Sequence, residues 1–292
     1  LKRSYRKTFK RNILDRWGRR DGRFGSNREM TRKMRAQNGT TAPGKFLPVI
    51  ENTEGKSPVI FVCEHASNAL PAPWGSLGLS EAETRAHIAW DPGALGLARG
   101  LASRLDATLI HAPVSRLIYD CNRGPDRPGA MPTRSEIHDI PGNTAISPAE
   151  RLARTEAIYL PWANGLHNLI ASRIATGRPP VIITIHSFTP VFHGQPRAVE
   201  FGVIHDADPT LALAILAEAQ AKTALNSQLN QPYSAADDVT HTLRLHATPY
   251  ALANAMLEIR NDLIASAQAE TAMADRLAPV LTAALTRLGG TT

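Results

Sequence analysis

Three residues of this sequence have side chains that could carry out chemistry together. His65 and His186 each follow a short apolar run, and Glu258 lies inside a third such run. Imidazole nitrogens combined with a carboxylate suit a catalytic Zn²⁺ ion, which keeps one position open for water. Such a metal lowers the pKa of its water and polarises a carbonyl group. The residue types therefore predict metal-assisted hydrolysis, with His65 and His186 as metal ligands.

Glu258 is the candidate general base. A carboxylate inside an apolar strand costs free energy unless it is paired, so its presence there needs a reason. It could take the proton of a metal-activated water and pass it to a leaving nitrogen. A structural ion pair with Arg260 or another basic residue is the alternative, and the sequence leaves it open.

A fourth polar segment runs from Arg116 to Arg123. Guanidinium groups bind carboxylates through two parallel hydrogen bonds, so these two arginines predict an acidic substrate. Arg134, Arg197 and Arg244 could add to the pocket, although each alone is more typical of a surface charge. One of His241 and His246, which flank Arg244, could stabilise a tetrahedral intermediate, although a structural role is equally typical of them.

The segments that must position these residues alternate between strands and helices. We expect strands at residues 58–63, 107–113, 181–185, 199–204 and 255–259. We expect helices that begin at Ser80, which has capping-box spacing to Glu83, and at Ser147. The second of these should kink near Pro161, and a closing helix over residues 269–288 should be interrupted by Pro279. Further helices are expected at residues 92–105 and after Asp208.

This alternation predicts an α/β fold with a mainly parallel sheet that helices cover on both faces. Ligands of such sheets bind outside the carboxyl ends of the strands. The polar clusters lie at these ends, and their convergence is the main argument from the residues for a single site.

Charge divides the chain into two parts. Residues 1–45 hold 15 Lys and Arg against three acids, whereas the remainder holds 18 Lys and Arg against 23 acids. We expect residues 1–45 to be a basic, disordered arm or mis-included upstream sequence, and residues 46–292 to form one α/β hydrolase domain. An anion-binding protein that is not an enzyme and uses this arm is an alternative from another class.

Composition argues against several other partners and compartments. Aromatic residues make up 5% of the chain, too few for a nucleic-acid stacking surface. The longest apolar runs are too short to span a bilayer. Two cysteines, Cys63 and Cys121, do not make a disulfide framework, so we expect a cytoplasmic protein. The sequence does not indicate an oligomeric state.

Four motifs carry a family resemblance. In chain order they are FVCEHASNALP at residues 61–71, SRLIYDCNRGP at 115–125, IHSFTP at 185–190 and LEIRNDL at 257–263. Together they resemble the N-formylglutamate amidohydrolase, or N-formylglutamate deformylase, family over about residues 57–265. That family resembles the zinc carboxypeptidases and aspartoacylases. The resemblance implies a three-layer, phosphorylase/hydrolase-like α/β fold with a mainly parallel or mixed sheet, and one Zn²⁺ ion.

The resemblance also implies roles for single residues. Glu258 occupies the position of the base in a Glu-Leu-Arg-like strand. The pair Asn122 and Arg123 resembles the pair that holds the substrate carboxylate, and Arg116 could polarise the scissile carbonyl. Arg260 and Ser187 complete the predicted substrate-binding set.

The third metal ligand departs from the related enzymes. The zinc carboxypeptidases use His-x-x-Glu, but the fourth position here is Asn68, and a neutral amide is a poor zinc ligand. Asp91 and Glu64 are the other candidates. We favour Asp91, because it opens a helix beside the expected site.

The resemblance predicts hydrolysis of N-formyl-L-glutamate to formate and L-glutamate, a reaction of histidine degradation. A small acidic N-acyl amino acid is thus the expected binding partner. Another N-acyl amino acid or a peptide-like amide would use the same site and is the alternative substrate.

Overall fold

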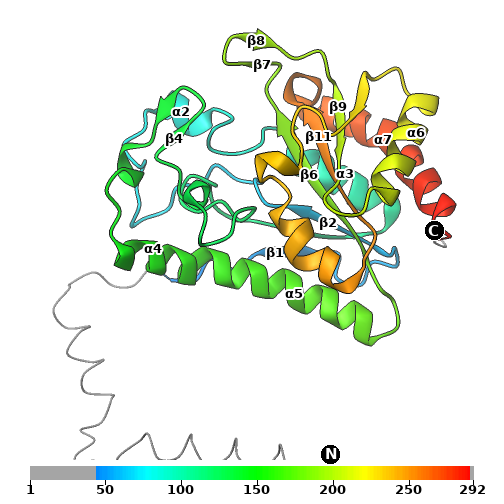
Figure 1. Cartoon of the computed structure of the whole chain (residues 1–292), viewed down its shortest axis with the longest axis horizontal. Helices are drawn as coiled ribbons and strands as arrows, with labels where there is room; N and C mark the ends of the chain where they lie inside the picture. The colour runs from blue at the N-terminus through cyan, green and yellow to red at the C-terminus, as the bar shows by residue number, and fades with distance from the viewer. Residues whose placement is uncertain (1–43, 290–292) are drawn as a thin grey trace, which may run out of the picture. The chain divides into compact units, whose positions relative to one another are not determined.

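The computed structural model describes residues 44–289, so nearly all of the predicted basic arm lies outside the described residues. Seven strands form one sheet in the order β1-β3-β2-β6-β11-β9-β10 (Figure 1). Their bounds are β1 Val49–Glu51, β2 Val59–Cys63, β3 Thr108–His111, β6 Val181–Phe188, β9 Phe201–Ile204, β10 Ser227–Leu229 and β11 Asn254–Arg260. Two hairpins stand apart from it: β4 Arg134–Ser135 with β5 His138–Asp139, and β7 Val191–Phe192 with β8 Gln195–Pro196.

The sheet is mixed. Parallel pairings join β3 to β2, β2 to β6, β6 to β11 and β9 to β10. Antiparallel pairings join β1 to β3 and β9 to β11. The predicted α/β class with a mainly parallel or mixed sheet is confirmed.

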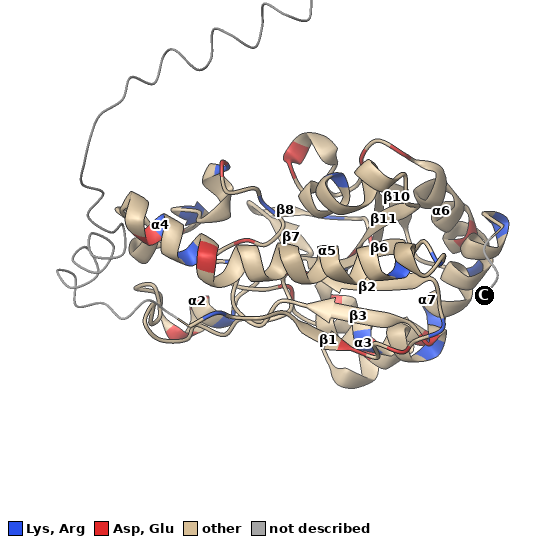
Figure 2. Cartoon of the chain, turned by 90° about the horizontal axis from the view of Figure 1, so that it is seen from below, with Lys and Arg blue, Asp and Glu red and all other residues tan. Residues whose placement is uncertain are grey.

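Helices cover both faces of the sheet. On one face the contacting helices are α3 Ala94–Leu105, α6 Thr210–Lys222 and α7 Ala267–Arg287. The other face is covered by α5 Leu160–Ala175, which continues from α4 Pro148–Arg154, and by the irregular helical segment of residues 243–250. Figures 1 and 2 show α5 running along the sheet on the side away from α3 and α7.

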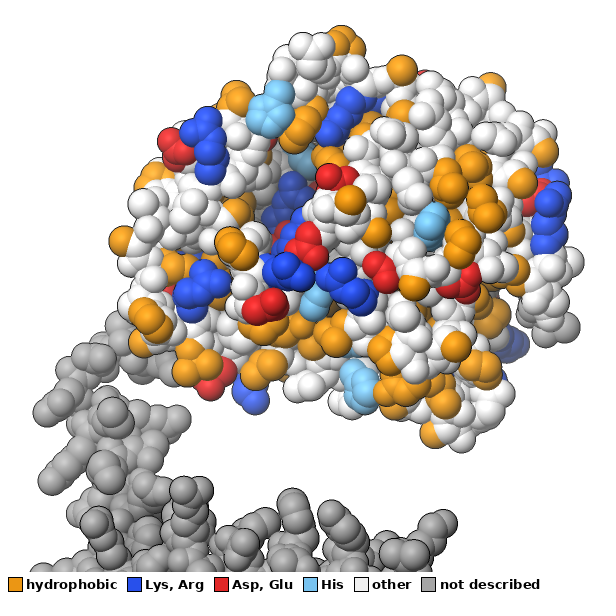
Figure 3. Space-filling view, viewed as in Figure 1, with side chains coloured by type: hydrophobic (Ala, Val, Ile, Leu, Met, Phe, Trp, Pro, Cys, Tyr) orange, Lys and Arg blue, Asp and Glu red, His pale blue; other side chains and the backbone are white. Residues whose placement is uncertain are grey.

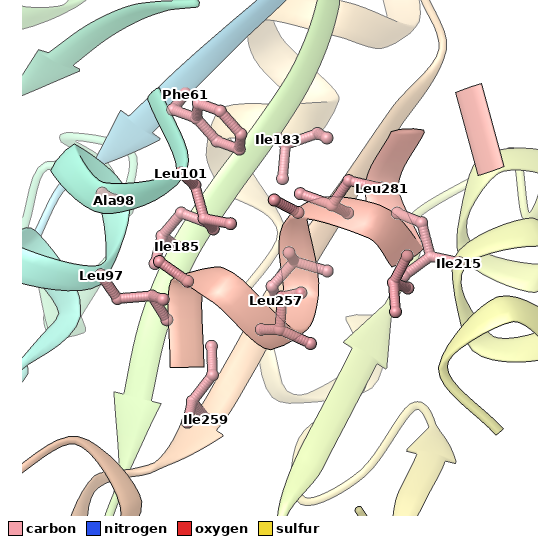
Figure 4. Packing of buried hydrophobic residues seen from close by; sticks show 14 of the residues in the cluster. Phe61, Leu97, Ala98, Leu101, Ile183, Ile185, Ile215, Leu257, Ile259 and Leu281 are labelled. Atoms are coloured by element: carbon pink, nitrogen blue, oxygen red, sulfur yellow. The ribbon is translucent and has the colours of Figure 1, made fainter. Parts of the chain in front are cut away.

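Alternate residues of the central strands enter different cores, because successive side chains of a strand point to opposite faces. Figure 4 shows Phe61, Ile185 and Leu257 from three adjacent strands against Leu101 of α3 and Leu281 of α7. The alternate residues of the same three strands point to the α5 face. The apolar ones among them are Ile60, Val62, Ile182 and Met256. The three central strands are thus buried on both sides.

The structure confirms both predicted helix caps but not the interruption predicted at Pro279. Ser80 and Glu83 form the predicted capping box of the short helix α2 Glu81–Arg85, and Ser147 caps α4. A π-helical turn, Thr155–Tyr159, precedes Pro161. The predicted interruption at Pro279 is wrong, because α7 is continuous from Ala267 to Arg287. Pro279 is exposed, so water can satisfy the carbonyl that loses its backbone partner there.

Within residues 44–289, no helix combines the length and the apolar character that crossing a bilayer demands. Cys63 and Cys121 are both buried and do not pair with each other.

Candidate active site

Three potential metal donors meet at the carboxyl ends of β2 and β6. The Nδ1 atom of His186 lies 3.2 Å from Nδ1 of His65 and 2.9 Å from Oδ2 of Asp91, and His65 Nδ1 lies 3.3 Å from the same oxygen. Asp91 enters from the turn before α3, where its backbone N–H donates to the carbonyl of His65. Four-coordinate zinc sites with bonds of about 2.0–2.1 Å place neighbouring donors about 3.3 Å apart, so the separations fit such an ion.

Each histidine of this donor set has a carboxylate beside its other ring nitrogen. Asp120 Oδ1 lies 2.8 Å from Nε2 of His65, and Glu64 Oε2 lies 3.1 Å from Nε2 of His186. All four side chains are buried. The hydrogen bond with Asp120 fixes the ring of His65 with Nδ1 towards the metal position, as is common for metal-binding histidines. Glu64 is within ion-pair distance of His186 but does not have hydrogen-bond geometry to it.

The electrostatics of these side chains agree with a site for a cation. Burial opposes the charged form of His65, but Asp120 and Asp91 raise its pKa above the usual value. Glu64 and Asp91 likewise overcome burial and raise the pKa of His186. Burial acts against ionisation of Asp91, yet His65 and Arg116 hold its pKa well below the ordinary value. The carboxylates thus stay charged, and a bound metal ion could replace the protons of the imidazoles.

Arg116 closes one side of this donor set. Its Nη1 donates to Nδ1 of His65 and to Oδ1 of Asp91, both at 3.1 Å. Its Nη2 and Nε donate to the backbone carbonyls of His87 and Ile88. Arg116 is therefore held rigidly beside the predicted metal position.

Glu258 lies next to His186 across the parallel pairing of β11 and β6. It is buried, and its Oε2 atom has no hydrogen-bond partner among the described residues. Burial raises its pKa to about 7, and the nearby charge of His186 opposes this only in part. Its other strand neighbour is Gly202, where a Cβ would touch Glu258 and collide with the carbonyl of Gln231. The absence of a side chain at Gly202 thus allows the Gln231 backbone to pass close to β9, next to Glu258.

These groups face one cavity of about 550 Å³. Figure 3 shows the molecule hollowed here, with Lys or Arg and His side chains inside the hollow. The donor set, Glu258 and Arg116 line it, together with Arg123, Arg197 and Tyr233. The cavity therefore brings a potential metal centre, a buried acid and several cations within reach of one small molecule.

The residues predicted to bind substrate have different surroundings. Arg123 lines the cavity, and Nη1 donates only to the carbonyl of Asn122. Asn122 also lines it, but its amide group bonds the backbone of Val239 and Thr242. Ser187 lines it too, with its hydroxyl donating to the carbonyl of Pro92. Arg260 is not among the lining residues. It pairs with Glu200 and Asp262.

Several other candidates lie away from the cavity. Asn68 donates to the backbone carbonyl of Thr84, and Glu64 contacts His186 on the side opposite the donor set. Arg134 and Arg244 are paired with acids, and His241 bonds the hydroxyl of Tyr159. His246 is a buried residue of the helical segment 243–250.

Three residues of the cavity were not among the site residues predicted from the sequence. His87 donates from Nε2 to the carbonyl of Ser187, and burial lowers its pKa to about 4, so it is neutral beside Arg116. Tyr233 lies in a loop without a motif. Asp120 lies within the family motif of residues 115–125, close to the predicted substrate-binding pair Asn122 and Arg123. This proximity was the signal in the sequence that could have identified it.

The fold places a His–Asp–His donor set, a buried glutamate and several arginines at one edge of an α/β sheet. The N-formylglutamate amidohydrolase family matches residues 57–265. The chain belongs to this family and is therefore an amidohydrolase.

The solved structures that resemble the chain include the following two. A gene product, Atu2144, from Agrobacterium tumefaciens has 50% sequence identity and a TM-score of 0.82, covering 84% of this chain and 97% of that one. An N-formylglutamate amidohydrolase from Ralstonia eutropha JMP134 has 18% identity and a TM-score of 0.62, covering 85% of this chain and all of that one, and shows the shared fold. None of the curated proteins compared matches the chain.

Proposed function

We propose that this amidohydrolase uses one Zn²⁺ ion to hydrolyse a small N-acyl amino acid, with N-formyl-L-glutamate, giving formate and L-glutamate, as the favoured substrate. The observation that carries the proposal is the single cavity onto which the donor set, Glu258 and Arg123 all open. The family match and the name of the Ralstonia structure support the choice of substrate.

His65, His186 and Asp91 would hold the ion. When bound, it supplies a Lewis acid and a water of lowered pKa. Glu258 is the proton carrier, because a pKa raised to about 7 lets it accept a proton near neutral pH and release it again. It would take the water's proton and deliver it to the leaving nitrogen, which completes cleavage of the amide.

Arg116 would bind the carbonyl oxygen of the scissile amide. Its three nitrogens already donate to His87, Ile88, Asp91 and His65. The bond to His65 Nδ1 cannot persist when that lone pair is used by a metal, so one Nη1–H then becomes free. That donor lies beside the donor set, where negative charge develops on the oxygen during hydrolysis.

Arg123 would hold the α-carboxylate of the substrate. It lines the cavity and has no acidic partner within ion-pair distance among the described residues. Its two-pronged donor geometry matches a carboxylate. Asn122, fixed by its backbone contacts, holds the loop that carries Arg123.

Metal analysis of the purified protein, combined with a panel of N-formyl and other N-acyl amino acids, tests the proposal. We expect about one zinc ion per chain and the highest kcat/KM for N-formyl-L-glutamate. Protein without metal that gains no activity from added zinc would contradict the metal role. Faster turnover of a longer N-acyl group would contradict the formyl substrate and leave the amidohydrolase.

A further inference from the structure

Two guanidinium groups in the cavity lack an acidic partner. Arg116 pairs with Asp91, but neither Arg123 nor Arg197 lies within ion-pair distance of a carboxylate in the described part of the chain. Both side chains are only partly buried, so water solvates them in the cavity, and a ligand carboxylate can replace that water and act as their ion-pair partner. Arg123 binds one carboxylate of the proposed substrate, and no ligand group has yet been assigned to Arg197.

Arg197 is held in place by its backbone. It follows β8 at the base of the β7–β8 hairpin, where its N–H donates to the carbonyl of Pro190 at 2.8 Å. Its own carbonyl accepts from Nη1 of Arg260 at 3.3 Å. The start of the side chain is therefore fixed before any ligand arrives.

The guanidinium of Arg197 is also fixed, while most of its donors stay free. Its Cζ atom lies 4.3 Å from the ring centre of Phe192, 4.9 Å from that of Tyr233 and 5.5 Å from that of Phe188. Aromatic faces orient a guanidinium by cation–π attraction without using its N–H groups. One Nη1 donor reaches the carbonyl of Thr189 at 3.5 Å. The remaining N–H groups can bind a ligand.

Other arginines around this site differ in both respects. Arg134 pairs with Asp139 and Arg244 with Asp238, and both lie outside the cavity. Arg260 was expected to bind substrate, but it bonds two acids and supports the backbone of Arg197 instead. Among the described residues, Arg197 and Arg123 are thus the two cavity-lining arginines without an acidic partner, and Arg123 is already assigned to the α-carboxylate.

Tyr233 connects Arg197 with the reacting groups. Its ring contacts Arg197 and lines the same cavity. Burial raises the pKa of Tyr233, the charge of Glu258 raises it further, and Arg197 opposes both. The phenol thus lies within electrostatic reach of the proposed base and of Arg197.

We infer that Arg197 determines substrate specificity by binding the side-chain carboxylate of a dicarboxylic N-acyl amino acid, while Arg123 binds its α-carboxylate. This inference rests on the proposed function for the identity of the amide, but not for the requirement of two carboxylates. Glu136 and Asp237, two acids that also line the cavity, are bound to the backbone of His193 and Ser234 and leave Arg197 to the ligand.

Binding of glutarate and butyrate, measured by calorimetry on the metal-loaded protein, tests the two-carboxylate site without catalysis. We expect glutarate to bind about 10- to 100-fold more tightly than butyrate, as one additional charged hydrogen-bonded contact implies. Arg197→Met keeps the stacked chain but removes the charge, so it should abolish this preference, and Arg197→Lys should restore part of it. Arg244→Ala, which removes an arginine outside the cavity, should keep the wild-type preference. Equal binding of the two acids by the wild type, or an unchanged preference in Arg197→Met, would overturn the inference.

Kinetics on N-formyl-L-glutamate and N-formyl-L-glutamine separate the inference from the proposed function. In Arg197→Met, the ratio of kcat/KM between these substrates should fall about 10- to 100-fold, mainly through a higher KM for the glutamate substrate. A wild-type ratio in this variant would overturn the role of Arg197. A wild type that hydrolyses neither substrate would contradict the proposed function instead, and glutarate binding would still decide the inference. Melting temperatures of Arg197→Met, Arg197→Lys and Arg244→Ala near that of the wild type show that the fold is intact.

Discussion

The two faces of the same strands serve different purposes in this protein. On the α3 and α7 side, β6 and β11 contribute mainly apolar side chains, such as Ile185 and Leu257, and the hydroxyl of Ser187 there is satisfied by the carbonyl of Pro92. On the α5 side, the same strands contribute Thr184, His186 and Glu258, which are buried polar groups with unpaired atoms. The apolar face thus stabilises the sheet, whereas the buried polar groups of the other face lower the stability and form the reactive site.

Two adjacent residues of β11 allow each face to be perturbed separately by mutation. Leu257 and Glu258 are adjacent in sequence and point to opposite faces. A change at one should affect stability, and a change at the other should affect turnover. The largest effect is expected at Glu258.

Glu258→Gln keeps the shape of the side chain but cannot accept a proton. We expect kcat to fall by about 10²–10⁴. Zinc content should stay the same, and the melting temperature should not decrease, because the amide is cheaper to bury than a carboxylate. Steady-state kinetics, metal analysis and thermal unfolding check these outcomes. Turnover close to that of the wild type would contradict the role of Glu258 as the base.

Leu257→Ala should show the reverse behaviour. The side chain is fully buried among α3, α6 and α7, so its truncation should lower the free energy of unfolding by about 2–5 kcal/mol. Denaturant unfolding measures this loss. At a temperature where the variant stays folded, its kcat should be near that of the wild type. A loss of kcat as large as that of Glu258→Gln would mean that the two faces are not independent.

Asp120→Asn sharpens the comparison within the polar face. Asp120 contacts Nε2 of His65 and does not belong to the donor set, so its loss should weaken zinc binding by about 10- to 100-fold. Competition with a chelator measures this affinity. Asp126→Asn is the matched control, since Asp126 is exposed and pairs only with Arg127. Equal affinities in the two variants would contradict the supporting role of Asp120.

The smallest effect is expected from His246, which belongs to the segment on the polar face. Burial lowers its pKa from 6.5 to about 4, so the folded protein keeps it neutral where the unfolded chain takes up a proton. Its contribution to stability is therefore constant above about pH 6.5 and is lost as the pH falls towards 4. The slope should be at most about 1.4 kcal/mol per pH unit. Unfolding of the wild type and of His246→Gln between pH 7 and 4 should show a shallower decline in the variant, and parallel declines would contradict this.

Local signals in the sequence were sufficient for most of the framework. The apolar runs at β2, β6 and β11, the capping residues Ser80 and Ser147 and the polar residues at the strand ends depend on neighbours a few positions away. Residue types at the strand ends indicated His65 and His186 as metal donors, and the position of Asp91 at the start of a helix indicated the third. Their role as ligands stays a prediction. Even so, Pro279 was misjudged, because the packing of α7 outweighs one missing backbone hydrogen bond.

What the sequence by itself determined was the set of elements and the strand ends at which chemistry could occur. Only the tertiary structure decided which charged groups are paired. Arg260 was predicted to bind substrate, yet it pairs with Asp262, two positions along the chain, and with Glu200, which is 60 positions away and brought close only by the fold. Arg197, without any motif, remains unpaired in the cavity between aromatic rings from β6, β7 and the loop at Tyr233. Whether a charged side chain finds a partner of opposite charge depends on which segments the fold brings within a few ångströms of it. Local sequence patterns do not show which distant segments these are.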